Sequence, residues 1–348
     1  MKELLVKLLE RKNLSREESQ EMILWIMSEE AIPTQAAALL ALLQAKGATT
    51  DEIVGAARAM RERSEKIQAP SDAIDTCSTG GNGISTFNIS TCAALIAAAG
   101  GAVVAKHGNR SNTRRSGSAE ALQALGVKID LDLSQVEACL QELQLCFCYA
   151  IKHHPAMRFA GSIRRELGIQ TVFNILGPLT NPAQVRRQLV GVPNVEWTFR
   201  IAQVLAELGA ERALVVHGAD GLCELTTTAK THVAELRDGK VELYQLEPEE
   251  VGLPNGNLEE MRVNSPEESA LMIREILQEK NQGTPRHVAL YNAAGALVVA
   301  GKAENLRDGV EQATQLVESG KAWQRLEELV KFTNQAAQVR GLPRLSTL

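Results

Sequence analysis

The residues best suited to chemistry gather in short segments, and the first of them follows an apolar stretch typical of a β-strand. This segment is STGGNG at residues 78–83. Its three glycines let the backbone turn tightly, and the amides at the start of the helix expected next favour an anion. It matches neither the Walker A pattern nor GxGxxG. It therefore fits either a plain turn or an anion-binding loop of another kind.

The second segment, residues 106–118, is rich in positive charge. It reads KHGNRSNTRRSGS and combines four cationic side chains with a histidine and several hydroxyl groups. A run of positive charge is often only a solvated face, but residues 76–119 contain no Asp or Glu in a chain whose net charge is −5. This exclusion of carboxylates favours an anion site, with phosphate groups as the natural ligands.

Further along the chain, acidic and basic side chains suit a metal ion and a carboxylate ligand. DGLCE at residues 220–224 fits either a polar turn or a Mg²⁺ site, since Mg²⁺ binds through one or two carboxylates and substrate phosphates. The pairs His153-His154 and Arg164-Arg165 fit structural roles or a site where a guanidinium holds a carboxylate. The sequence has no nucleophile elbow and no Ser/His/Asp order. This favours catalysis by positioning and charge stabilisation over a covalent intermediate.

The elements before these segments are predicted to be helical. Capping-box spacing occurs at Ser15 with Glu18 and at Thr49 with Glu52, and Pro33 marks another helix start. We expect four short helices in a small bundle. The run LLALL at residues 39–43 is expected to leave apolar surface uncovered, which suits a partner surface such as a second copy of the chain.

From about residue 70, short apolar stretches alternate with helical patterns. Strands are expected over 73–78, 102–108, 146–151, 188–192 and 212–218, and helices over 87–100, 118–126, 133–145 and 197–209. This alternation predicts an α/β fold with a mostly parallel sheet, whose ligands bind at the carboxyl ends of the strands. Residues 306–335 form one long helical pattern.

The composition is that of an ordinary globular protein of about two domains. The 348 residues are 45% apolar and 23% charged, with 37 basic against 42 acidic side chains, so nucleic acid and anionic membranes are not expected partners. No apolar run approaches the roughly 18 residues of a membrane span, and the first residues lack the pattern of a signal peptide. We therefore expect a cytoplasmic protein. Its six scattered cysteines are expected to be reduced and buried.

Longer motifs connect these segments to a known family. They are STFNIST at 85–91, KHGNR…SGSAE.LQALGV at 106–127, HHPAM…RRELGI.T.FNILGPL.NPA at 153–183 and VVHG.DGL.EL at 215–225. In this order and spacing, the chain resembles the anthranilate phosphoribosyltransferase family over nearly its whole length. The resemblance implies a helical domain at 1–68 joined by a returning segment at about 160–182, an α/β domain at 69–348, and a homodimer formed through the N-terminal helices.

The resemblance also implies an activity and a set of site residues. The activity is transfer of the phosphoribosyl group from phosphoribosyl pyrophosphate to anthranilate, in tryptophan biosynthesis, with Mg²⁺ as cofactor. The family pattern assigns the metal to Ser90 and Glu224, with Cys223 at a usual Asp position, and anthranilate to His107, Asn109, His154, Arg164 and Gly177. It assigns phosphoribosyl pyrophosphate to Ser78, Thr79, Gly80, Gly81, Asn82, Thr86, Asn88, Ser90, Thr91, Lys106, Arg114 and Ser118.

The departures from the family pattern lie mainly in the phosphate and metal parts. Ser78 and Asn82 replace the Gly and Asp that usually bound the first loop, Thr113 and Arg114 replace two serines, and Cys223 replaces an Asp. A thiol is a poor Mg²⁺ ligand, so a second metal ion is not assured, and Arg114 is a candidate replacement for its charge. Near the acceptor, Phe159 replaces a histidine, and Ala229-Lys230 replaces Gly-Pro.

Two other functions fit parts of the sequence. Ser78-Thr79-Gly80-Gly81 resembles the phosphate loop of pyrimidine nucleoside phosphorylases, whereas KHGNR and HHPAM do not belong to that family. The missing metal ligand fits a non-catalytic relative that binds nucleic acid or another partner. The acidic net charge and the joint presence of His107, Asn109 and Arg164 argue against that alternative.

Overall fold

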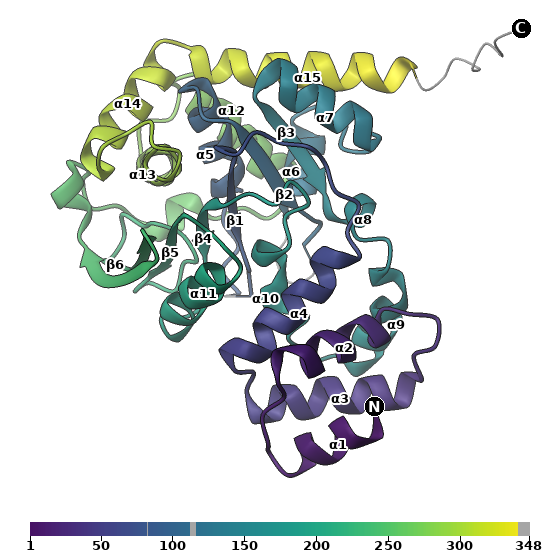
Figure 1. Cartoon of the computed structure of the whole chain (residues 1–348). Coiled ribbons are helices and arrows are strands. Elements are labelled where there is room, and N and C mark those ends of the chain that lie inside the picture. The colour runs from purple at the N-terminus through teal and green to yellow at the C-terminus, as the bar shows by residue number, and fades with distance from the viewer. Residues whose placement is uncertain (82, 112–115, 340–348) are drawn as a thin grey trace, which may run out of the picture.

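The computed structural model describes residues 1–81, 83–111 and 116–339. A helical bundle lies at one end of the molecule, and a sheet covered by helices on both faces forms the rest (Figure 1). None of the helices in these described stretches is long and apolar enough to cross a membrane.

The bundle begins with four helices, as the sequence predicts. They are α1 (Lys2–Leu9), α2 (Arg16–Ile26), α3 (Pro33–Lys46) and α4 (Thr50–Glu62). Both predicted capping boxes are present: Ser15 and Glu18 close one at the start of α2, and Thr49 and Glu52 close one at the start of α4. Each box satisfies backbone donors that the first turn of a helix leaves free.

The described strands form one seven-stranded sheet in the order β3-β2-β1-β4-β5-β6-β7. The first five in this order are parallel, while β6 pairs antiparallel with β5 and β7 with β6. The strands are β1 (Ile74–Ser78), β2 (Val104–Gly108), β3 (Leu145–Tyr149), β4 (Arg187–Gly191), β5 (Arg212–Gly218), β6 (Thr231–Arg237) and β7 (Lys240–Leu246). The mostly parallel sheet is confirmed.

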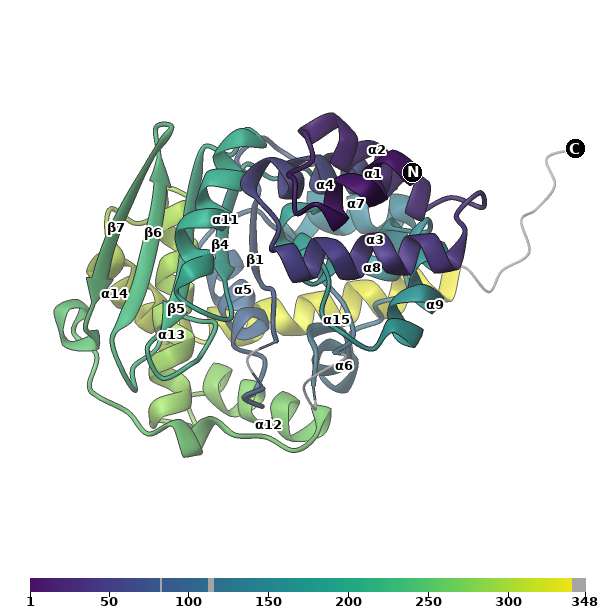
Figure 2. The same cartoon turned by 90° about the horizontal axis from the view of Figure 1, so that it is seen from below.

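The remaining helices cover the sheet or extend the bundle. Figure 2 shows β6 and β7 at the edge of the sheet away from the bundle. The helices are α5 (Ile89–Ala99), α6 (Ser118–Ala124), α7 (Leu133–Leu143), α8 (Ala150–His153), α9 (Met157–Leu167), α10 (Phe173–Leu176), α11 (Glu196–Glu207), α12 (Pro266–Leu277), α13 (Thr284–Val299), α14 (Leu306–Glu318) and α15 (Lys321–Val339), with 3₁₀ turns η1 (Gly177–Leu179), η2 (Pro248–Val251) and η3 (Leu258–Met261).

Two apolar cores meet at the sheet. In β4, Leu189 packs into the core that includes α5 and α13, and the next residue, Val190, packs into the core shared by the bundle and α11. Leu214 and Val215 alternate in the same way in β5. Successive strand residues point to opposite faces, so this alternation places the sheet between the two cores. The second core also contains residues of α9 and α10, which lie beside the bundle.

Three details differ from the sequence prediction. Residues 306–335 do not form one helix, because Gly320 takes a φ of +75° and separates α14 from α15. The β6–β7 hairpin was not predicted. Most of the run LLALL is covered within the chain, since Leu39, Leu40 and Leu43 are buried, while Leu42 is half-buried.

Candidate functional site

A cavity of about 800 Å³ opens along the carboxyl ends of β3, β2, β1 and β4, facing the bundle. Parallel strands end at the same edge of a sheet, and the loops that follow them converge there. The expected segments around residues 80, 107, 154 and 177 all contribute to its wall. The cavity also extends to α9, which carries Arg164.

The glycine-rich loop after β1 forms one wall of this cavity. Gly80 and Gly81 have φ values of +65° and +88°, a region that side chains other than glycine rarely adopt. Asn88 caps α5, because its Oδ1 accepts from the amide of Thr91 at 3.0 Å. Ser90 stands in the first turn of α5 and also lines the cavity. The loop is therefore more than a plain turn: it leads exposed backbone and a helix start to the cavity.

Lys106 brings a buried positive charge to the same wall. Its side chain is 3% exposed, and its Nζ donates to the Thr76 carbonyl and, at 3.0 Å, to Ser90 Oγ. Burial lowers the pKa of Lys106, while the charges of Asp75 and Glu224 oppose that shift. A cation held among acidic groups and next to helix α5 is well placed to meet an anionic ligand.

Asp75 is a buried residue behind the cavity wall that the sequence reasoning missed. Its carboxylate is fully buried and accepts from the His107 amide at 3.1 Å and from Asn181 Nδ2 at 2.8 Å. Burial raises the pKa of Asp75, and nearby Lys106 opposes that rise. A lone acidic residue inside the apolar stretch AIDTCS is a signal that could have identified it, because buried carboxylates need partners.

The segment that follows β2 folds back against the end of that strand. A side chain at Gly108 would place its Cβ 2.1 Å from Ser118 Oγ, so only glycine allows Ser118 to approach the strand. Ser118 Oγ in turn donates to the Asn109 carbonyl at 3.4 Å. This close approach brings Ser118 and Asn109 into the same cavity wall.

His107 and His154 form a buried imidazole pair on the acceptor side predicted from the sequence. His107 Nδ1 lies 3.1 Å from the Gly177 carbonyl, a contact in which the ring nitrogen can only donate. Its Nε2 is then an acceptor for His154 Nε2 at 3.3 Å. Burial lowers the pKa of His107 well below its ordinary value and that of His154 to about 4. Both rings are therefore neutral at pH 7.

The buried neutral His154 should make stability depend on pH. Its pKa is about 4 in the folded protein and about 6.5 when unfolded, so the unfolded chain binds the proton first as the pH falls. The free energy of unfolding should drop by about 2 kcal/mol between pH 7.5 and pH 5 through this ring alone. Urea unfolding at both pH values should show that His154→Gln lacks this part of the decrease. An identical decrease in variant and wild type would contradict it.

Arg164 lies on the part of the cavity wall that is predicted to bind anthranilate. It lies on α9, its guanidinium stands 5.2 Å from the centre of the Phe173 ring, and burial lowers its pKa. It lines the cavity together with Gly177. Arg165, by contrast, is exposed. A guanidinium that stacks on an aromatic ring keeps its edge available for a carboxylate.

The segment at residues 220–224, which follows β5, packs against β4 and the glycine-rich loop. A Cβ at Gly191 would lie 1.7 Å from the Cys223 carbonyl oxygen, and Cys223 Sγ lies 3.9 Å from the Gly80 carbonyl. Glu224 is 6% exposed and acts electrostatically on Lys106. Within the described residues, no group of three or more His, Cys, Asp or Glu side chains forms a metal cluster.

The structure places most of the predicted site residues around one cavity. Thr86, Thr91, Cys223 and Glu224 do not line it, and Asn82, Thr113 and Arg114 lie outside the described residues. Phe159, Ala229 and Lys230, which differ from the family pattern, are also absent from its wall. The predicted site residues that do line the cavity are Ser78, Thr79, Gly80, Gly81, Asn88, Ser90, Lys106, His107, Asn109, Ser118, His154, Arg164 and Gly177. None of the six cysteines, all of them among the described residues, forms a disulfide, and five are buried while Cys77 is half-buried.

Comparisons with known proteins agree with this organisation. The model "Glycosyl transferase family, helical bundle domain" matches residues 2–64, and "Glycosyl transferase family, a/b domain" matches residues 70–323. Anthranilate phosphoribosyltransferase from Anaeromyxobacter dehalogenans (strain 2CP-C) is 47% identical over 330 residues, covering 94% of this chain and 97% of its own. The enzyme of the same name from Acetivibrio thermocellus is 46% identical, with 96% and 97% covered.

Solved structures that are similar to this chain carry the same enzyme name. Anthranilate phosphoribosyltransferase from Thermus thermophilus superposes with a TM-score of 0.90 at 40% identity, covering 95% of this chain and 99% of its own. The enzyme from Saccharomyces cerevisiae, solved in complex with PRPP and Mg, superposes with a TM-score of 0.87 at 28% identity, covering 96% and 97%. These names agree with neither a nucleoside phosphorylase nor a nucleic-acid-binding relative. The chain belongs to the anthranilate phosphoribosyltransferase family.

Proposed function

We propose that this chain transfers the phosphoribosyl group from phosphoribosyl pyrophosphate to the amine of anthranilate, releasing pyrophosphate. The observation that carries the proposal is a single cavity that holds a buried cation beside a helix start and, further along, an arginine beside neutral imidazoles. The first part suits a diphosphate and the second an aromatic carboxylate. Family membership supports both assignments.

In the donor part of the cavity, the positive charge belongs to a lysine side chain that hydrogen bonds hold in place. Lys106 Nζ is held by Thr76 and Ser90, and the amides after Asn88 begin helix α5. As the bond from the ribose C1 to pyrophosphate breaks, negative charge grows on the departing oxygens. Donors fixed in advance stabilise that charge with little reorganisation.

In the acceptor part, Arg164 binds the anthranilate carboxylate and so directs the amine toward the donor. His107 and His154 are neutral, so they do not add charge that would repel a positively charged ribosyl group. An aromatic amine is uncharged at pH 7 and can attack C1 directly. The new C1–N bond forms as the C1–O bond to pyrophosphate breaks, which leaves a positively charged nitrogen. This aryl ammonium is acidic and gives its proton to water, so no strong base is required.

We propose that Ser90, in the cavity wall, and Glu224, buried behind that wall, would hold a Mg²⁺ ion that arrives with the substrate. Ser90 Oγ and the Glu224 carboxylate both lie in the surroundings of Lys106, whereas Cys223 offers a thiol that Mg²⁺ disfavours. One carboxylate with pyrophosphate oxygens is an ordinary Mg²⁺ environment. A bound Mg²⁺ would neutralise charge on the leaving pyrophosphate. We propose that one ion is sufficient here.

A carboxylate at position 223 should raise the affinity of the enzyme–substrate complex for Mg²⁺. We expect Cys223→Asp to lower the Mg²⁺ concentration that gives half the maximal rate by about tenfold, since a second oxygen ligand adds roughly 1.4 kcal/mol or more of binding. Cys223→Asn is the matched control, because it has the same shape without the charge. Rates measured over a Mg²⁺ series should separate the two variants, and equal half-saturation in both would show that position 223 does not meet the ion.

Two further features belong to this proposal. We expect a homodimer formed through the N-terminal helices, because Val6 and Leu9 of α1 are 53% and 67% exposed, and large exposed apolar side chains favour association. We also expect the protein to act in the cytoplasm, as part of tryptophan biosynthesis.

The proposal is tested by offering the purified protein two pairs of substrates. The first pair is phosphoribosyl pyrophosphate with anthranilate, and the second is a pyrimidine nucleoside with inorganic phosphate, both with Mg²⁺. Chromatography of the products should show N-(5-phosphoribosyl)anthranilate from the first pair and no free base from the second. Phosphorolysis of the nucleoside without a product from anthranilate would overturn the proposal.

A further inference from the structure

The turn at residues 177–181, which we call the acceptor loop, is held by side chains from several distant elements. The Gly177 carbonyl accepts from His107 Nδ1 at 3.1 Å, and the Pro178 carbonyl accepts from Gln188 Nε2 at 2.8 Å. No local sequence pattern indicates this arrangement, because the donors come from β2 and β4. A loop whose successive backbone oxygens are engaged in this way is fixed in one geometry.

The far end of the acceptor loop is anchored in the sheet. Asn181 Nδ2 donates at 2.8 Å to both Asp75 Oδ2 and the Ala105 carbonyl. Asp75 uses its other oxygen to accept from the His107 amide at 3.1 Å. The two ends of the loop are therefore tied to the same short part of β1 and β2.

Between these two ends, the carbonyl of Leu179 accepts a hydrogen bond from a side chain of the helical bundle. Arg61, on α4, donates from Nε to the Leu179 carbonyl at 2.7 Å and from a terminal nitrogen to the Leu208 carbonyl at 3.3 Å. Both oxygens stand at the ends of helical turns, η1 and α11, where carbonyls lack partners within the helix. Burial lowers the pKa of Arg61 to about 10, and the described residues include no acidic partner for it.

One rigid peptide unit carries the effect of Arg61 to the acceptor site. The Leu179 carbonyl and the Thr180 amide belong to the same planar group. The Thr180 amide donates to the Gly177 carbonyl at 3.3 Å, and that carbonyl also orients His107. Gly177, Pro178 and Thr180 line the cavity, whereas Leu179 and Arg61 do not. Arg61 therefore does not reach the cavity itself, but it holds a loop that lines it.

We propose that Arg61 is a positioning residue, by which the helical bundle sets the acceptor loop and the His107 ring for the aromatic substrate. The inference rests on the proposed function, since it concerns the anthranilate half of the same cavity. Loss of the guanidinium frees the Leu179–Thr180 peptide to rotate and loosens the Gly177 carbonyl. The donor half, built on Lys106 and Ser90, has no contact with Arg61 and keeps its geometry.

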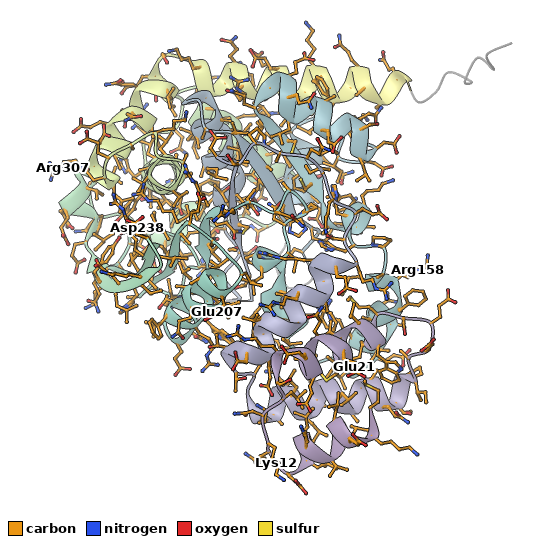
Figure 3. All side chains as sticks on the ribbon, in the orientation of Figure 1. Lys12, Glu21, Arg158, Glu207, Asp238 and Arg307 are labelled. Carbon is orange, nitrogen blue, oxygen red and sulfur yellow. The ribbon has the colours of Figure 1, made fainter. Side chains whose placement is uncertain are left out.

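The matched control is Arg16, which ties the bundle to the same helix without touching the acceptor loop. It pairs with Asp51 and, at 2.9 Å, with Glu207 of α11. Figure 3 shows Glu207 where the bundle meets the α/β part. Replacing Arg16 removes a contact between the two parts of the molecule and leaves the Leu179 carbonyl held. The Arg16 variant therefore measures how the KM values respond when the junction between the bundle and the α/β part is weakened in general.

The experiment compares steady-state kinetics of Arg61→Met, Arg61→Lys and Arg16→Met, each with varied anthranilate and varied phosphoribosyl pyrophosphate. We expect Arg61→Met to raise the KM for anthranilate about tenfold and change the KM for phosphoribosyl pyrophosphate less than twofold. Arg61→Lys should restore most of the loss, since an ammonium can still donate to Leu179, and Arg16→Met should match wild type. Melting temperatures establish that each variant is folded.

The outcomes separate this inference from the proposed function. A wild-type protein that does not consume anthranilate overturns the proposed function itself. An active wild type with an unchanged anthranilate KM in Arg61→Met overturns the role of Arg61 alone. Equal increases of both KM values, or the same increase in Arg16→Met, also overturn it, because they show a general loosening of the junction.

Discussion

Lys106→Met should lower kcat by about 10³-fold while the protein stays folded. Lys106 is the buried cation in the part of the cavity wall that we assign to the donor: it is 3% exposed and fixed by Thr76 and Ser90. Removing one fixed donor from a site of developing negative charge typically costs 10²–10³ in rate, and the charge of the ammonium adds to that loss. Stopped-time assays with both substrates at saturation measure it.

A neutral side chain at position 106 should also lower stability, because Asp75 and Glu224 lose the cation that faces them. The control is Lys152→Met, which removes a half-buried lysine paired with Asp130 at 2.7 Å. This control should match wild type within about 0.5 kcal/mol in unfolding free energy and in rate. A folded Lys106→Met protein with a kcat within threefold of wild type would show that Lys106 does not meet the leaving group.

Gly191→Ala should destabilise the protein by about 3 kcal/mol or more. The added Cβ would lie 1.7 Å from the Cys223 carbonyl oxygen and 2.9 Å from Ser78 Cβ. Neither obstacle is the end of a flexible side chain, so the segment before Glu224 must move away from β4. We expect loss of activity together with loss of stability, since the displaced segment carries Glu224.

The matched control for this substitution is Gly161→Ala. Gly161 lies in α9, and a Cβ there would meet nothing within 4 Å. Alanine in a helix is favoured over glycine by roughly 0.5–1 kcal/mol, so this variant should be as stable as wild type or slightly more stable. Urea midpoints measure both. A wild-type midpoint for Gly191→Ala would contradict the close approach of the Cys223 segment to β4.

The sequence predicts the local elements well because their signals are local. The capping boxes at Ser15 and Thr49 mark helix starts through residues three positions apart, and the parallel strands appear as apolar stretches. The β6–β7 hairpin has a local signal as well, the pair Asp238-Gly239, whose φ values in the structure are +51° and +75°. A two-residue turn of this kind joins antiparallel strands.

Long-range contacts explain the failures. LLALL was expected to face a partner, yet Leu39, Leu40 and Leu43 are buried because helices from residues 157–176 and 196–207 pack with the bundle. No local pattern shows which helix returns to cover another. The break at Gly320 is a different case, since one glycine in a helical pattern can be tolerated or can end the helix.

The residues of the cavity also divide into those with a local sequence signal and those that depend on long-range contacts. Lys106 and His107 stand out in the sequence because they lie in a basic run that excludes carboxylates, whereas Arg164 is assigned to anthranilate through the family resemblance. Asp75 and Arg61 were not predicted, since their importance lies in the atoms they hold: the Asn181 amide and the Leu179 carbonyl. Both contacts join residues more than 100 positions apart in the sequence. Such pairs become visible only when the fold is known.

The most direct test of the account follows the fluorescence of anthranilate and the release of pyrophosphate in one reaction with the purified wild-type protein. With phosphoribosyl pyrophosphate and Mg²⁺ present, we predict that the two change in equal amounts, and that omitting the donor or adding a chelator stops both. A folded protein that leaves anthranilate unchanged, or that releases pyrophosphate without consuming anthranilate, would contradict the account.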